Sequence, residues 1–69
     1  MTDIENIIEV ALVHQRNGKL QRARYLYDKI LQIDPRNSDA IHLIGMIEYS
    51  GHKYELAIAL IKKAIKLSP

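Results

Sequence analysis

Apolar residues recur every three or four positions near the start of the chain, which is the spacing that places side chains on one face of an α-helix. The residues on this face are Ile4, Ile7, Ile8, Ala11 and Leu12. Either Thr2 or Asp3 can cap the helix, since both side chains accept hydrogen bonds from the free amides of a first turn. Asn17-Gly18 follows, and both residues tolerate the left-handed backbone that ends a helix. We therefore predict a first helix that ends just before this dipeptide.

A second helix is predicted from about Leu20 to Gln32. Its inner stripe consists of Ala23, Tyr27, Ile30 and Leu31. Asp34-Pro35 stops the helix, because proline disfavours helical geometry in the residue before it.

The other half of the chain predicts a second pair of helices. Ser38 or Asp39 is the expected cap of a helix over Ala40 to Ser50, and Gly51-His52 supplies the next turn. The inward residues of this helix are expected to be Ile41, Ile44, Gly45 and Ile47. The last helix is predicted from Tyr54 to Leu67. No segment has the alternating pattern of a strand, so the expected fold class is all-α, with four antiparallel helices.

The two pairs of helices are related by an offset of 34 residues, which also separates Pro35 from Pro69. The offset superposes apolar residues on apolar ones and small residues on small ones. The aligned pairs include Ile7 with Ile41, Val10 with Ile44, Ala11 with Gly45, Lys19 with Lys53, Ala23 with Ala57 and Leu26 with Leu60. A match of this length indicates a duplicated helix-turn-helix unit.

With this period, the chain resembles the tetratricopeptide repeat family over essentially its full length. The residues that carry the resemblance are Ile7, Val10, Ala11, Gly18, Leu20, Ala23, Tyr27 and Pro35 in the first unit, and Ile41, Ile44, Gly45, Tyr54, Ala57, Ile61, Ala64 and Pro69 in the second. The resemblance implies an α-α superhelix, or solenoid, in which residues 1–69 form one domain, with repeat one at about 4–37 and repeat two at about 38–69. One departure is that the turn glycine of the second unit, Gly51, lies one place early, with His52 in its place.

In this family the first helix of each repeat lines a concave groove that holds an extended peptide or a partner helix. The resemblance places Glu5, Ile8, Glu9, Leu12 and Arg16 of the first unit there, with Asp39, His42, Leu43, Met46, Tyr49 and Ser50 of the second. The family's lysine and asparagine clamp for carboxylates is replaced by Ile8, Leu12 and Leu43, and its asparagine ladder by Glu9 and Leu43. An alternative is that Ile8, Leu12, Leu43 and Met46 merely pack against each other between the repeats.

The last helix carries two apolar stripes. One consists of Tyr54, Ala57, Ile58, Ile61, Ala64 and Ile65, and is expected to pack against its own repeat. The other is a candidate self-association face that consists of Leu56, Ala59, Leu60, Lys63 and Leu67. Because repeat units leave an apolar face for their neighbour, this face is expected to meet either further repeats of a longer parent chain or a second copy in a homo-oligomer.

Composition limits the chemistry that the chain can perform. There is no cysteine. His14 and His42 could approach each other from adjacent repeats, but no third metal ligand is evident beside them. No metal site, cofactor or catalytic residue is therefore expected, and the chain is not expected to be an enzyme. The net charge of +2 comes from interspersed residues, which argues against a nucleic-acid partner. We expect no membrane span and no secretory signal, and hence a cytoplasmic protein.

Two functions follow from these observations. The first is a scaffold that binds a peptide or helix of a partner protein through the concave groove. The alternative is an N-terminal repeat segment of a larger transferase-type protein, which would mediate assembly or position a substrate without activity of its own.

Overall fold

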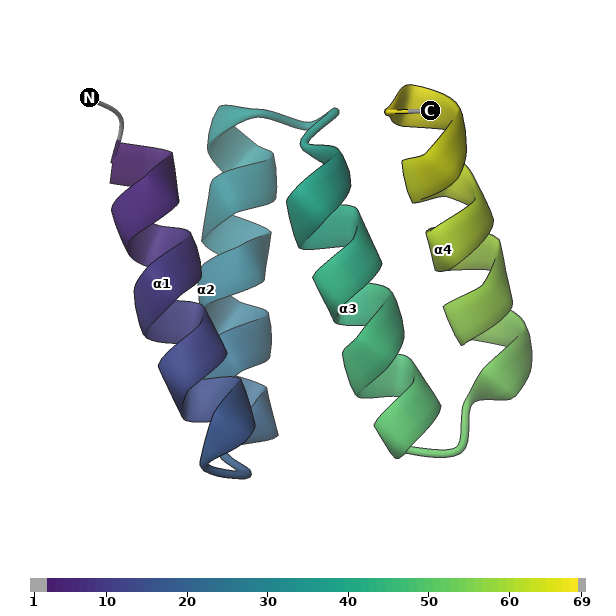
Figure 1. Ribbon diagram of the computed structural model, residues 1–69, viewed down its shortest axis with the longest axis horizontal. Coiled ribbons are helices and arrows are strands. Elements are labelled where there is room, and N and C mark those ends of the chain that lie inside the picture. The colour runs from purple at the N-terminus through teal and green to yellow at the C-terminus, as the bar shows by residue number, and fades with distance from the viewer. Residues whose placement is uncertain (1–2, 69) are drawn as a thin grey trace.

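A computed structural model describes residues 3–68, and within them the chain forms four α-helices and no strand. The helices are α1 (Asp3–Arg16), α2 (Leu20–Ile33), α3 (Ser38–Ser50) and α4 (Tyr54–Leu67). Successive helices run in opposite directions and lie in chain order across the molecule (Figure 1). Each packs against the next, so α1 and α2 form one hairpin, α3 and α4 form another, and α2 contacts α3. The predicted all-α class and the antiparallel order are confirmed for these residues.

The two hairpins turn in the same way, at positions 34 residues apart. Gly18 has a φ of 80° and His52 a φ of 65°, so both occupy the left-handed region. After each of these residues, a lysine amide donates back into the preceding helix: Lys19 to the His14 carbonyl at 2.8 Å, and Lys53 to the Glu48 carbonyl at 2.9 Å. Gly51, in contrast, has a φ of −87°. The helix therefore ends in the same register in both units, and the left-handed residue of the second is a histidine.

The cap of α3 differs from prediction. The cap of α3 is Asn37, whose side-chain oxygen accepts from the Ala40 amide at 2.9 Å. Predicting Ser38 or Asp39 was wrong because the helix starts at Ser38, so both residues already lie within its first turn. The proposed Thr2 cap lies outside the described residues, and Asp3 is the first residue of α1.

Small residues let the two helices of each hairpin approach closely. Gly45 shows this most clearly, because a Cβ atom added there would lie 3.0 Å from Ile61 Cγ1 and 3.4 Å from the Ala57 carbonyl oxygen. The core consists of Ala11, Ala23, Tyr27, Ile30, Ala40, Ile44 and Ile47. Tyr27 donates from its hydroxyl to Gln15 Oε1 at 2.7 Å. Burial raises the pKa of Tyr27 above its ordinary value of 10.0.

An ion pair crosses the joint between the hairpins. Glu48 is the one charged side chain that is buried among the described residues, and it accepts a hydrogen bond from Nη1 of Arg24 on α2. Lys53 Nζ lies 4.0 Å from the other carboxylate oxygen. Arg24 Nε lies 3.7 Å from Asp28 Oδ1 and makes no hydrogen bond. The pair therefore fixes α3 against α2 at a buried carboxylate.

The last helix is covered less than its sequence predicts. Ala57 and Ala64 are buried, but Tyr54, Ile58 and Ile65 are exposed. The expectation that their whole stripe packs within its own hairpin was wrong, because α4 turns Ala57, Leu60 and Ile61 toward Gly45 of α3 and leaves the three exposed side chains on an outer flank. Within residues 3–68, every helix is too short or too polar to span a bilayer.

Candidate protein-binding surface

The predicted groove residues on α1 and α3 differ in how deeply they are buried. We call this set the α1/α3 surface. Its exposed members are Glu5, Glu9, Arg16, Asp39, His42, Met46, Tyr49 and Ser50, and its half-buried members are Ile8, Leu12 and Leu43. Ile8 and Leu43 also pack against the core. These two residues therefore contribute to packing against the core, whereas Met46 faces outward.

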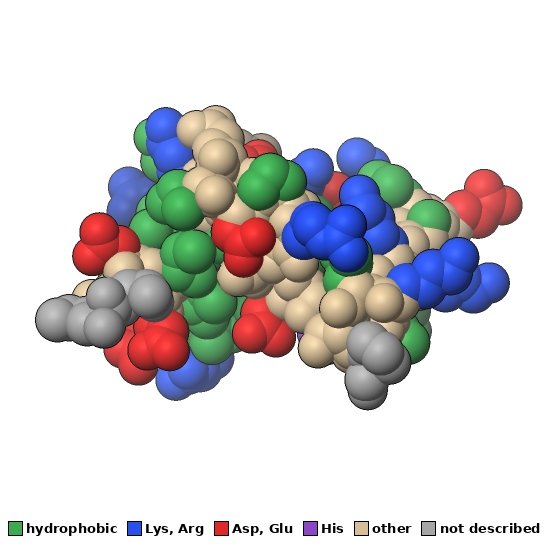
Figure 2. Space-filling model, turned by 90° about the horizontal axis from the view of Figure 1, so that it is seen from above, with side chains coloured by type: hydrophobic (Ala, Val, Ile, Leu, Met, Phe, Trp, Pro, Cys, Tyr) green, Lys and Arg blue, Asp and Glu red, His purple; other side chains and the backbone are tan. Residues whose placement is uncertain are grey.

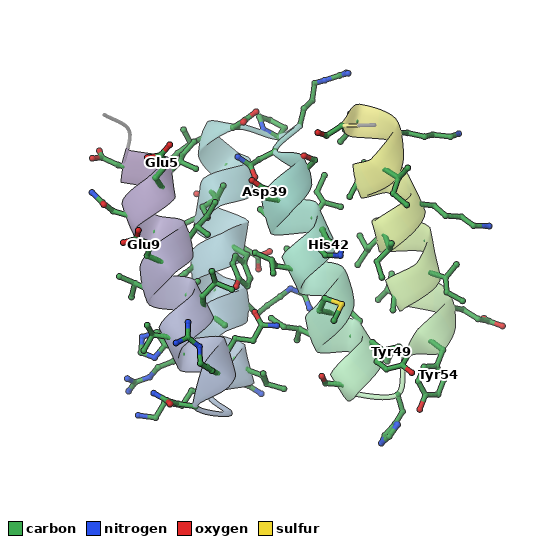
Figure 3. The ribbon with its side chains drawn as sticks, viewed as in Figure 1. Glu5, Glu9, Asp39, His42, Tyr49 and Tyr54 are labelled. Atoms are coloured by element: carbon green, nitrogen blue, oxygen red, sulfur yellow. The ribbon has the colours of Figure 1, made fainter. Side chains whose placement is uncertain are left out.

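The side chains of this surface point in different directions. Glu9 projects from the side of α1 that faces away from α3, whereas His42 lies on the side of α3 that faces α4 (Figure 3). His42 and Asp39 line a hollow of about 170 Å³ together with Ala64 and Ile65 of α4. The polar side chains of the α1/α3 surface are thus spread around the two helices, and some of them border α4.

An exposed apolar centre lies on α3. Tyr49 has 58% of its surface exposed and Met46 has 41%, which makes them the large exposed apolar side chains of this helix. The ring of Tyr49 meets that of Tyr54 edge to face, with 5.1 Å between their centroids (Figure 3). The Tyr54 hydroxyl in turn lies 2.7 Å from His52 Nδ1. These contacts hold the aromatic rings in place at the turn end of the second hairpin.

Sequence reasoning missed this aromatic cluster. It treated Tyr54 as a packing residue and His52 as a simple turn residue. The signal was present, however, because Tyr49 and Tyr54 flank a turn of only three residues and must therefore lie close together once the helices reverse. Aromatic side chains that are ordered and exposed are the residues most enriched at the centres of protein interfaces.

The acidic and histidine side chains of this surface do not gather into one cluster among the described residues. Among residues 3–68, no three of the His, Asp and Glu side chains come together as a metal site would require. His14 and His42 line separate hollows, the first with residues of α2 and the second with residues of α4. The two histidines therefore do not share one site.

The predicted self-association face is not one continuous uncovered face. Leu56, Ala59 and Lys63 are exposed, but Leu60 and Leu67 are half-buried and Leu60 packs against the core. The larger uncovered apolar area of α4 lies on the opposite flank, where Tyr54, Ile58 and Ile65 are exposed.

Comparison with known proteins adds no relative to this picture: no family model matches the chain, and no curated protein does.

Proposed function

We propose that this chain is a protein-binding scaffold of the tetratricopeptide kind, which takes a peptide or a helix of a partner protein on the α1/α3 surface. The observation that carries the proposal is the exposed pair Met46 and Tyr49, set on a rigid helix and bordered by polar side chains. The family resemblance is supported by the 34-residue period, which recurs in the backbone as the paired turns at Gly18 and His52.

The chemistry of the surface suggests what the partner carries. Apolar side chains of the partner would cover Met46 and Tyr49, because burying such exposed side chains contributes roughly 25 cal/mol per Å² of apolar area. Asp39 is exposed in the first turn of α3. A basic residue of the partner would therefore lie toward this end of α3. The expected ligand is an apolar segment with a basic residue at one side.

Selection from a displayed peptide library tests the proposal without a known partner. The immobilised chain is expected to enrich apolar peptides, whose affinity is then measured for Met46→Glu and Tyr49→Glu. Each substitution places a charge at the centre of the contact, so the dissociation constant should rise at least about tenfold, equivalent to about 1.4 kcal/mol.

A matched control is available on α2. Tyr25 is 60% exposed, nearly the same as Tyr49, but it lies outside the α1/α3 surface. Tyr25→Glu should leave binding of the selected peptides unchanged. Equal losses for Tyr25→Glu and Tyr49→Glu, or a library that yields no peptide sensitive to Met46→Glu, would count against the proposal.

A further inference from the structure

The contact between the two hairpins shows how one unit receives the next. Around the Arg24–Glu48 pair, α2 contributes Leu20, Tyr27 and Leu31 to the core and its border, and α3 contributes Ala40, Ile44 and Ile47. Arg24 bonds to Glu48, and Ile47 lines one hollow with Leu20 and Arg24. The remaining residues belong to the core or pack against it. This joint is thus a template for unit-to-unit packing in this chain.

The counterparts of these residues form two faces at opposite ends of the molecule. Shifting the α2 residues forward by 34 gives the α4 end face, which consists of Tyr54, Ile58, Ile61 and Ile65. Shifting the α3 residues back by 34 gives the α1 end face, which consists of Asn6, Val10, Val13 and His14. Both faces are apolar at their centres, as the two sides of the joint are.

Both end faces are uncovered. On the α4 end face, Tyr54, Ile58 and Ile65 are 46%, 52% and 58% exposed. On the α1 end face, Val10 and Val13 are 51% and 48% exposed. At the joint, in contrast, Ile44 and Ile47, the counterparts of Val10 and Val13, are buried. The counterparts of the three α4 residues are half-buried there, namely Leu20, Arg24 and Leu31. At each end of the molecule, the β-branched and aromatic side chains of the end face therefore remain in contact with solvent.

The charges that flank the two end faces have opposite signs. Because α3 runs antiparallel to α2, equivalent packing would set the start of α1 beside the end of α4. Asp3 lies in the first turn of α1 and Glu9 near its middle, and Lys62 and Lys66 lie in the last half of α4. In the view onto these helix ends, acidic side chains lie at the α1 end and lysine side chains at the α4 end, with further charges of both signs elsewhere (Figure 2). Attraction between them would favour this orientation over the reverse.

We infer that a second copy of this chain docks its α1 end face onto the α4 end face of the first and so repeats the joint between α2 and α3. Ile58 takes the place of Arg24 and His14 that of Glu48, so the contact is apolar where the internal joint has an ion pair. The two faces differ, which makes the contact heterologous and open-ended. The occupant is thus a copy of this chain, held by the flank of α4 opposite to Leu56.

Sedimentation of variants tests both the contact and its polarity. The weight-average mass of the wild-type chain should climb above the 7.9 kDa of the monomer as concentration rises. Val10→Glu and Ile58→Glu should each remain monomeric alone, because each lacks one of the two faces. Mixed together, they should form a one-to-one dimer, since Val10→Glu retains the α4 end face and Ile58→Glu retains the α1 end face.

Two controls separate this inference from its competitors. Leu56→Glu, on the other flank of α4, should associate like the wild type, and so should Met46→Glu, which leaves both end faces intact. The inference is overturned if the wild type stays monomeric at millimolar concentration, or if the Val10→Glu and Ile58→Glu mixture does not pair. An isologous dimer through α4 alone would give that second result.

Cross-linking gives a second measurement that does not depend on disrupting the face. The chain has no cysteine, so Val13→Cys and Ile58→Cys each introduce a single thiol. Under mild oxidation the mixture should form the mixed disulfide several-fold faster than either variant forms its own dimer. Equal rates for all three products would contradict the head-to-tail contact.

Discussion

Replacing either partner of the Arg24–Glu48 pair should destabilise the chain by unequal amounts. The side chain of Glu48 is 7% exposed, whereas that of Arg24 is 42% exposed. Arg24→Met keeps the apolar stem but leaves a buried carboxylate with Lys53 as its nearest cation, 4.0 Å away. Glu48→Gln instead leaves an arginine that reaches solvent and lies near Asp28. The carboxylate is therefore the group that cannot tolerate the loss of its partner.

The magnitudes follow from burial. Breaking a buried pair by removing one partner costs about 3–5 kcal/mol, and the exposure of Arg24 reduces this because solvent already screens the pair. Removing Arg24 also removes a buried Nε that makes no hydrogen bond, which offsets part of the loss. We expect Arg24→Met to lower the free energy of unfolding by about 2 kcal/mol. Glu48→Gln should lower it by about 0.5–1 kcal/mol, because the amide oxygen still accepts from Arg24.

Urea unfolding followed by far-UV circular dichroism measures these changes directly. The double variant Arg24→Met/Glu48→Met should be more stable than Arg24→Met alone, since two apolar side chains leave no buried charge. The reasoning is refuted if Glu48→Gln costs as much as Arg24→Met, or if the double variant loses the sum of the single losses.

Three further perturbations test the turns, the close helix contact and the buried hydroxyl. His52→Gly should raise the free energy of unfolding by about 0.5–1 kcal/mol in urea titrations, because glycine adopts a φ of 65° without strain. Gly18→Ala should lower the free energy of unfolding by about 1 kcal/mol, because alanine is strained at a φ of 80°. Changes of the same sign for the two variants would contradict this reasoning. Gly45→Leu should lower the free energy of unfolding by about 3 kcal/mol, since the first added carbon already lies 3.0 Å from a neighbouring side chain, and an unchanged urea midpoint would argue against the packing. Burial raises the pKa of Tyr27 above 10.0, so the unfolded chain loses this proton first and stability should fall as the pH rises past 10.0. Tyr27→Phe should flatten this fall and Tyr25→Phe should not, and equal slopes for both would exclude Tyr27 as its cause.

The helices and their period were predictable because they depend on local patterns. The bounds of α4 agree with prediction at both ends, and those of α2 differ by one residue. Helical spacing and the turn residues Gly18 and Pro35 suffice for this. The residue with the left-handed backbone was harder to predict, because glycine adopts that conformation more often than histidine and Gly51 stands next to His52. Only the register of the hairpin assigns it to His52.

The contact between the hairpins was not predicted from the sequence. Arg24 and Glu48 are 24 residues apart, and their pairing depends on how α2 crosses α3. A sequence signal did exist, because Glu48 falls on the same helical face as Ile41 and Ile44, where a charge needs a partner. For a related reason, the flank of α4 with Tyr54, Ile58 and Ile65 was predicted to pack against its own hairpin, although it is exposed. Two apolar stripes on one helix do not reveal which of them meets its own hairpin.

The most direct test of the proposed binding surface is a map of chemical shifts when a selected peptide is titrated into the ¹⁵N-labelled chain, with the Met46 methyl as an added probe. We predict that the shifts centre on Met46 and Tyr49, continue to Leu12 of α1, and leave Tyr25 of α2 and Ile58 of α4 unchanged. Shifts confined to α2, or to the α4 end face, would contradict the account.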